Sequence, residues 1–178
     1  HPLNAQSPYA ASKVAADQLS LSYYRSFKLP IKIIRPFNTF GPRQSNRAVI
    51  PRIIIQCLNK KNTRLNLGNL KPTRDFNYVE DTCEAYFQVL NSKKIIGEII
   101  NVGSNTNISI ENIAKKIMVM TNRKLKFFSN KKILRPKLSE VTDLQCDNQK
   151  IKKLSNWNSK VNLDNGLKKT IQWIKKNY

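Results

Sequence analysis

Histidine and cysteine are scarce in this chain of 178 residues. The single histidine is His1, which excludes metal sites built on imidazole ligands. The three cysteines are Cys57, Cys83 and Cys146; they lie far apart and form no Cys-x-x-Cys pair. Cys57 and Cys83 fall within helical patterns, where we expect buried structural thiols. This cysteine usage fits a reducing, cytoplasmic compartment.

Long apolar runs are absent as well. No stretch approaches the roughly 20 apolar residues that a membrane span needs, and no signal-peptide pattern opens the chain. We therefore expect no membrane partner. The chain opens on His rather than Met, and we expect it to be the back half of an enzyme.

Acidic residues are few: 11 Asp and Glu stand against 32 Lys and Arg, a formal net charge of +21. Lys, Asn and Ile, which share A- and T-rich codons, make up over a third of the chain. The lysines are scattered, and no arginine-rich arm or basic strip interleaved with aromatics stands out. We expect no nucleic-acid partner and keep a non-catalytic, basic nucleic-acid-binding protein as the remote alternative. A positive field would also help to attract a small anionic substrate.

The first 35 residues carry the clearest periodicity. Apolar residues at helical spacing predict a helix over residues 8–28, with Ser7 as its N-cap and Pro8 in its first turn. The β-branched run over residues 31–35 predicts a buried parallel strand that stops at Pro36. A helix, a short loop and a buried strand form half a unit of a doubly wound α/β sheet.

Alternation of helices and strands continues to the end of the chain. Helices are predicted over residues 49–60, 80–91, 109–121, 148–154 and 163–176. Strands are predicted over residues 65–67, 75–78, 97–103 and 124–128, with a turn at 68–73. The fold class is therefore α/β: the carboxyl-terminal part of a doubly wound parallel sheet, followed by a smaller α/β lobe. We expect the division at residues 42–43, with residues 78–103 crossing back to the sheet.

Tyr9 and Lys13 form the first candidate site. Residues four apart on a helix lie one turn apart on the same face. An ammonium in that position favours the ionised phenol, which turns a weak acid into a usable base. Tyr-x-x-x-Lys alone also occurs by chance on the surface of amphipathic helices, so the pair gains its meaning from the motifs around it.

Those motifs run the length of the chain. Ser7-Pro8 precedes the pair, and Arg35-Pro36-Phe37-Asn38-Thr39-Phe40-Gly41-Pro42 follows the first strand. Further on come Thr73-Arg74-Asp75-Phe76-Asn77-Tyr78-Val79-Glu80-Asp81, Asn101-Val102-Gly103, Arg135-Pro136 with Ser139-Glu140-Val141, and Trp157. Together they resemble the extended short-chain dehydrogenase/reductase family, specifically its nucleotide-sugar epimerases and dehydratases.

The resemblance implies the cofactor NAD and a Rossmann-type fold, with residues 1–42 belonging to the NAD-binding domain and residues 43–178 to the nucleotide-sugar lobe. In this family Tyr9 would take the proton from the sugar 4-hydroxyl while hydride leaves C4 for the nicotinamide. Lys13 would lower the phenol pKa and hydrogen-bond the nicotinamide ribose. Pro36 and Phe37, at the carboxyl end of a parallel strand, would contact the nicotinamide.

The resemblance also implies residues that bind the substrate, a nucleotide-diphosphate sugar. Asn38 would contact the sugar or its diphosphate, although a loop Asn can also satisfy its own backbone. Arg74 and Arg135 would bind the diphosphate, since a guanidinium matches phosphate geometry; a surface or ion-paired arginine is the alternative.

The expected base pocket is apolar. Val49 and Leu67 would line it, with Phe76 near the base or ribose, and simple core packing is the alternative for all three. Arg43 and Arg47 could reach the phosphates or remain solvated loop charges.

The chain also lacks parts that the family has. The dinucleotide fingerprint G-x-x-G-x-x-G does not occur in it, nor does the segment with the Ser/Thr of the catalytic triad and the Asp-Glu pair of dehydratases. We therefore expect the chain by itself to be an inactive fragment. The resemblance further implies that the complete enzyme is a homodimer.

Within the family, His1-Pro2-Leu3 and the segments Arg35–Ser45 and Arg47–Pro51 most resemble UDP-N-acetylglucosamine 4,6-dehydratases of the legionaminic acid type. The expected reaction is oxidation at C4, elimination of water and return of hydride to C6. The alternative is a UDP-sugar 4-epimerase, which shares the first step and returns hydride to the other face of C4.

Overall fold

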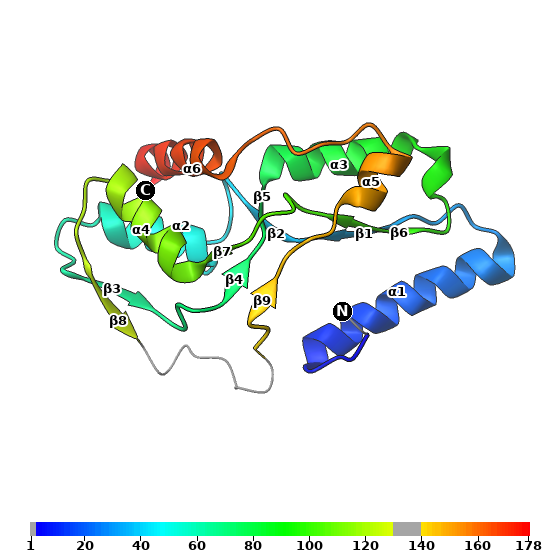
Figure 1. Cartoon of the computed structure of the whole chain (residues 1–178), viewed down its shortest axis with the longest axis horizontal. Helices are drawn as coiled ribbons and strands as arrows, with labels where there is room; N and C mark the ends of the chain where they lie inside the picture. The colour runs from blue at the N-terminus through cyan, green and yellow to red at the C-terminus, as the bar shows by residue number, and fades with distance from the viewer. Residues whose placement is uncertain (1–2, 130–139) are drawn as a thin grey trace.

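The computed structural model describes residues 3–129 and 140–178 (Figure 1). Arg135, predicted to bind the diphosphate, lies outside the described residues. The helices are α1 (Pro8–Phe27), α2 (Val49–Leu58), α3 (Val79–Asn91), α4 (Ile110–Met120), α5 (Gln149–Leu154), α6 (Leu163–Asn177) and the short 3-10 helix η1 (Lys93–Ile95). The strands are β1 (Ile33–Pro36), β2 (Asn38–Phe40), β3 (Arg64–Leu67), β4 (Thr73–Arg74), β5 (Phe76–Tyr78), β6 (Ile99–Val102), β7 (Ile108–Ser109), β8 (Lys126–Ser129) and β9 (Asp143–Leu144).

Helix α1 begins and ends where its sequence predicts. The Ser7 hydroxyl accepts a hydrogen bond from the Ala10 N–H at 3.1 Å, and Pro8 occupies the first turn. Lys28 ends the helix in the left-handed conformation, with φ of 55°, and its N–H caps the Tyr24 carbonyl. None of the helices in the described residues could cross a membrane.

Parallel pairing dominates the strands, as expected for the α/β class. β1 pairs with β6, β2 with β5 and β3 with β8, all in parallel, so that the chain returns over residues 79–98 to place β6 beside β1. The short strand β4 pairs antiparallel with β7 and parallel with β9. Figure 1 shows α3 and α1 on opposite sides of β1 and β6, and α2, α4 and α6 gathered at the other end of the molecule.

Two apolar clusters match this arrangement. The larger cluster packs α2, α4 and α6 against β2, β3 and β5, with Phe40, Ile53, Leu65 and Ile113 almost wholly buried. The smaller cluster packs α3 and α5 against β6 and includes Trp157. Burial of these side chains supplies most of the driving force that holds each set of elements together.

A buried carboxylate connects three distant segments. Asp75 lies between β4 and β5 and is fully buried. Its Oδ1 accepts hydrogen bonds from the Ser104 N–H at 2.8 Å and the Ser104 hydroxyl at 2.7 Å, and its Oδ2 accepts from the N–H groups of Asn105 at 2.9 Å and Cys146 at 3.1 Å. A buried carboxylate is tolerated only with partners of this kind, so Asp75 fixes the loop after β6 and the segment after β9.

Asp81, in the first turn of α3, fixes the segment that precedes α6 in a similar way. Its Oδ2 accepts from the Ser159 hydroxyl and from the N–H groups of Lys160 and Val161 at 2.9–3.1 Å. Its backbone carbonyl accepts from the Trp157 indole N–H at 2.8 Å. The segment that leads into α6 is therefore tied to the start of α3.

The cysteines differ in part from expectation. Cys57 is buried in α2 as predicted, whereas Cys83 is exposed because it lies on the solvent side of α3. Cys146 is buried, and burial, followed by the nearby charges of Asp75 and Asp147, raises the pKa of its thiol to about 12. Burial also raises the pKa of the Cys57 thiol.

We expect Asp75→Ala to lower the free energy of unfolding by about 3 kcal/mol or more, because it removes the acceptor of four buried or partly buried hydrogen bonds. Urea unfolding followed by tryptophan fluorescence measures this change, since Trp157 is buried. The control is Glu111→Ala, which removes an exposed ion pair with Lys115 and should cost less than about 0.5 kcal/mol. Equal costs for the two variants would contradict the role given to Asp75.

The cysteine environments predict selective alkylation. Iodoacetamide at pH 8 should label Cys83 in the folded protein, whereas Cys57 and Cys146 should react only after unfolding, because their raised pKa values and burial leave no accessible thiolate. Mass spectrometry of peptides reads out each site, and Cys83→Ser should abolish labelling of the native protein. Labelling of native Cys146 would show that its surroundings are more open than described.

Candidate functional site

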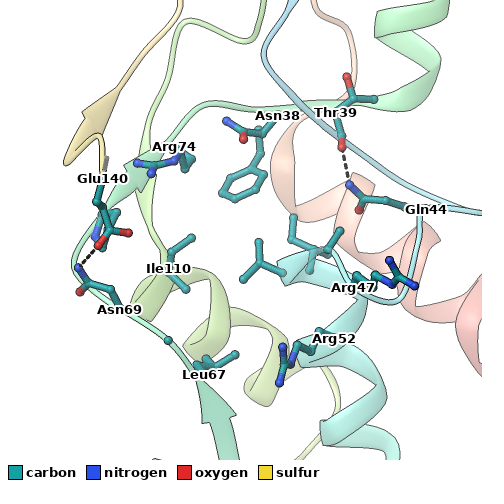
Figure 2. A pocket seen from close by; sticks show the side chains of 16 residues that line it. Asn38, Thr39, Gln44, Arg47, Arg52, Leu67, Asn69, Arg74, Ile110 and Glu140 are labelled. Atoms are coloured by element: carbon teal, nitrogen blue, oxygen red, sulfur yellow. Dashed lines mark hydrogen bonds between the residues drawn. The ribbon is translucent and has the colours of Figure 1, made fainter. Parts of the chain in front are cut away.

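The candidate site is a cavity of about 440 Å³ between β2, β4, β5 and the first turn of α2 (Figure 2). It is lined by Asn38, Thr39, Gln44, Arg47, Ala48, Val49, Ile50, Arg52, Leu67, Gly68, Asn69, Pro72, Arg74, Phe76, Ile110 and Glu140. The carboxyl end of β3 and the start of α4 complete the wall. The lining thus comes from six elements spread over residues 38–110 and from Glu140.

One part of the wall is apolar. Val49 and Ile50 open α2, Leu67 closes β3, and Ile110 opens α4. Phe76 of β5, which is 7% exposed, contributes a flat aromatic ring. Such a surface suits a flat, weakly polar group of a ligand.

Three arginines bring positive charge to the cavity wall. Arg74 comes from β4, Arg47 from the loop before α2, and Arg52 from α2 itself. Figure 2 shows Arg74 on one side of the cavity and the other two arginines on the opposite side. The first turn of α2 has no acidic residue and no side-chain cap, so the positive end of its dipole adds to the field. A ligand with several negative charges fits this lining.

Amide and carboxylate groups are held in place around the cavity. The Asn38 amide donates to the Asp75 carbonyl at 3.1 Å, and the Gln44 amide donates to the Thr39 carbonyl at 2.7 Å. At the rim, the Glu140 carboxylate accepts from the Asn69 amide at 2.8 Å. These bonds fix each amide nitrogen and thereby orient the side chain at the wall.

Tyr9 and Lys13 lie on one face of α1, as predicted from their spacing. The Lys13 ammonium stands 5.7 Å from the centroid of the Tyr9 ring. Both side chains are exposed, Tyr9 by 72%. Neither lines the cavity, so the described residues place the Tyr-Lys pair and the cavity on separate parts of the fold.

In the sequence, Pro36 and Phe37 lie between α1, which carries the Tyr-Lys pair, and the cavity residue Asn38. They follow the buried part of β1, and the Phe37 N–H donates to the Val102 carbonyl at 2.8 Å. The segment therefore leaves the carboxyl ends of two parallel strands, where ligands bind in open α/β sheets. One residue later, Asn38 begins β2 and reaches the cavity wall.

Five predicted substrate residues, namely Asn38, Val49, Leu67, Arg74 and Phe76, line this single cavity. Arg47 lines it as well, whereas Arg43 is exposed, has a φ of 65° and is not part of the lining. The fold thus brings these predicted residues to one cavity, and their role in substrate binding is a prediction.

Sequence reasoning missed the other lining residues, among them Gln44, Arg52, Ile110 and Glu140. Arg52 had a usable signal, because it lies one turn from Ala48 and on the same side of α2 as the predicted Val49. Ile110 had none, since it reaches the cavity only through the pairing of β4 with β7. Glu140 belongs to the motif with Arg135-Pro136, but the motif assigned it no role.

Comparison with known proteins gives consistent matches. A model of the GDP-mannose 4,6 dehydratase family matches residues 1–170. The dTDP-D-glucose 4,6-dehydratase of Homo sapiens is 32% identical over 99% of this chain. Among solved structures, Pal from Bacillus thuringiensis superposes with a TM-score of 0.88 at 38% identity over 98% of this chain. The UDP-glucuronic acid 4-epimerase of Bacillus cereus, solved with UDP-glucuronic acid and NAD, gives 0.87 at 31% identity over 97%.

The chain spans about half the length of these proteins: 51% of the human protein, 55% of the Bacillus thuringiensis chain and 54% of the Bacillus cereus chain. The chain therefore has the fold of the part of each solved structure that it covers.

Proposed function

Since the chain belongs to the GDP-mannose 4,6 dehydratase family within the extended short-chain dehydrogenases/reductases, we propose that it forms part of an NAD-dependent nucleotide-sugar 4,6-dehydratase. The reaction oxidises the sugar at C4, eliminates water and returns hydride to C6. The substrate is a nucleotide-diphosphate sugar, of which a UDP-sugar is the first candidate.

The lining of the cavity carries this proposal. Apolar side chains with one aromatic ring suit a nucleobase, and arginines on two sides suit a diphosphate. In the proposal Val49, Leu67 and Phe76 hold the base and ribose, Arg74 binds the diphosphate, and Asn38 contacts the sugar or diphosphate. Arg135 is proposed as a second diphosphate ligand from the family resemblance alone.

The chain supplies residues that fit only one end of NAD. The Tyr9 hydroxyl and Lys13 ammonium are a donor set suited to a ribose, and Pro36 and Phe37 leave the carboxyl end of a parallel strand. No glycine-rich first turn is present in the sequence to cradle the pyrophosphate. When bound, NAD accepts and returns the hydride of the reaction.

The residues of the chain would then act as follows. Tyr9 takes the proton of the sugar 4-hydroxyl on its Oη as C4 is oxidised. Lys13 holds a positive charge beside that ring and donates a hydrogen bond to the nicotinamide ribose. Because both side chains come from one helix face, their relative placement is set by α1 itself.

Further parts of the proposal rest on family resemblance. They are a homodimer of the complete protein, and a division of the chain into residues 1–42 and 43–178 with 78–103 returning to the sheet. The matches also include an epimerase at similar identity, so a UDP-sugar 4-epimerase is the second candidate. Product analysis separates the two: a dehydratase forms a 4-keto-6-deoxy sugar, whereas an epimerase changes only the configuration at C4.

We expect Tyr9→Phe in the complete protein to abolish turnover of a panel of UDP-N-acetylglucosamine, UDP-glucose and dTDP-glucose, because the proton acceptor is removed. Nucleotide-sugar affinity, measured by calorimetry, should change little, since Tyr9 lies outside the cavity. Tyr23→Phe is the matched control, an exposed tyrosine on the same helix that should retain turnover. Near-wild-type activity of Tyr9→Phe would refute the assignment of the base.

Arg74→Ala should weaken the affinity for the nucleotide sugar by ~1.5–3 kcal/mol, the scale of a charge-assisted contact. Arg25→Ala, in the exposed last turn of α1, serves as the control for the loss of one positive charge. Calorimetric titration with the same nucleotide sugar measures both variants. An affinity unchanged by Arg74→Ala would remove this residue from the proposed site.

A further inference from the structure

Within the described residues, few side chains of helix α1 contact the rest of the fold. Of its 20 residues, Leu21 alone is buried. Its large apolar side chains Leu19, Tyr23 and Phe27 are 46–67% exposed. In the described residues, a broad buried face therefore cannot set the position of the helix that carries Tyr9 and Lys13.

One row of side chains along α1 connects the Tyr-Lys pair to the sheet. Tyr9, Lys13, Asp17 and Leu21 recur every four residues and so lie on one strip of the helix. The two later members contact the rest of the fold. Leu21 is buried, and the Asp17 Oδ2 accepts a hydrogen bond from the Arg35 Nε of β1 at 2.6 Å.

This contact is the one ion pair that joins α1 to another described element. It is also partly shielded, with side-chain exposures of 33% for Arg35 and 19% for Asp17. The Arg35 Nη2 is buried and has no hydrogen-bond partner among the described residues. Loss of the Asp17 carboxylate would therefore leave a half-buried guanidinium without its counter-charge, which is costly.

A second contact lies farther along the helix. An ideal Cβ placed on Gly97 would come within 2.3–2.9 Å of atoms of the Tyr24 ring, and Gly97 has a φ of 79°. The ring therefore lies against the backbone just before β6, where only glycine fits. Contacts at Asp17 and Tyr24, together with the buried Leu21, hold the helix to β1 and to the segment that leads into β6.

We propose that the Asp17–Arg35 ion pair is a positioning device for the Tyr9–Lys13 pair, and that Asp17 is a positioning residue for the reaction. The inference rests on the proposed function. Asp17 lies one helical turn from Lys13 and two from Tyr9. Its bond to β1 fixes the rotation of α1 about its own axis, and so fixes the direction in which the Tyr9 hydroxyl and Lys13 ammonium point.

The test compares Asp17→Asn with wild type in the complete protein. We expect kcat to fall about 100-fold, the scale of a misplaced reactive group, while KM for the nucleotide sugar stays within about twofold, because the cavity residues lie elsewhere. Asp17→Glu keeps the carboxylate and should recover most of kcat. The matched control is Asp164→Asn on α6, which removes the 2.8 Å pair with Lys116 of α4 and should leave kcat unchanged.

Hydrogen exchange provides a readout that does not depend on activity. In Asp17→Asn, amides of residues 9–27 should exchange faster than in wild type, while those of residues 43–129 should exchange at the wild-type rate. Asp164→Asn should leave α1 unchanged. This pattern, with the kcat loss at constant KM, supports the inference.

Three outcomes would overturn it. Wild-type kcat and wild-type exchange of α1 in Asp17→Asn would show that the pair positions nothing. Faster exchange throughout the protein would show that it supports the whole fold rather than α1. A wild-type protein that turns over no nucleotide sugar would refute the proposed function and with it the positioning role, even if Asp17→Asn still loosened α1.

Discussion

The buried carboxylate of Asp75 is the constraint on which the cavity depends. It joins the β4–β5 junction to the loop after β6 and the segment after β9 through four hydrogen bonds of 2.7–3.1 Å. Successive side chains of an extended segment point to opposite sides. When Asp75 turns toward Ser104 and Cys146, its neighbours Arg74 and Phe76 turn together toward the cavity. The buried Asp75 carboxylate thus orients both the Arg74 guanidinium and the Phe76 ring toward the cavity.

All acidic residues of the chain, Asp75 included, have a partner within it. Each of the 11 forms a hydrogen bond or an ion pair; they are Asp17, Asp75, Glu80, Asp81, Glu84, Glu98, Glu111, Glu140, Asp143, Asp147 and Asp164. The acidic side chains are therefore engaged within the chain, although Glu80, Glu98, Glu111 and Asp164 are 43–60% exposed. The 32 Lys and Arg leave a large excess of positive charge. A cavity lined by three arginines and one carboxylate, Glu140, lies within this excess, which favours an anionic ligand.

Long helices and buried strands could be predicted from the sequence because their signals are local. Ser7 and Pro8 mark the start of α1, and the β-branched run before Pro36 marks β1. The two-residue strands β4, β7 and β9 could not be predicted, because they have no periodicity and exist only through pairing over distant parts of the chain. The exposure of Cys83 was also missed, since a helical pattern does not say which face another element covers.

The same distinction applies to the site. Motif residues such as Asn38, Arg74 and Phe76 could be placed in one group from the sequence, and they line one cavity. Gln44 and Glu140 could not, because their position depends on bonds to the Thr39 carbonyl and the Asn69 amide. The separation of Tyr9 from the cavity could not be predicted either, because local sequence signals predict helix α1 but not its position relative to the cavity.

Placement of the Tyr-Lys helix relative to the cavity depends on one short stretch of backbone. β1 pairs with β6 and ends at Pro36; after Phe37 the chain continues as β2, which pairs with β5. Arg35 holds α1 through Asp17, and Asn38, three residues later, lies in the cavity wall and bonds to the Asp75 carbonyl. Because β1 and β2 are each paired in parallel with another strand, a shift of either one would move the Tyr-Lys pair relative to the cavity. The short segment at Phe37, where the pairing with β6 ends and the pairing with β5 begins, therefore fixes the position of the Tyr-Lys helix relative to the cavity.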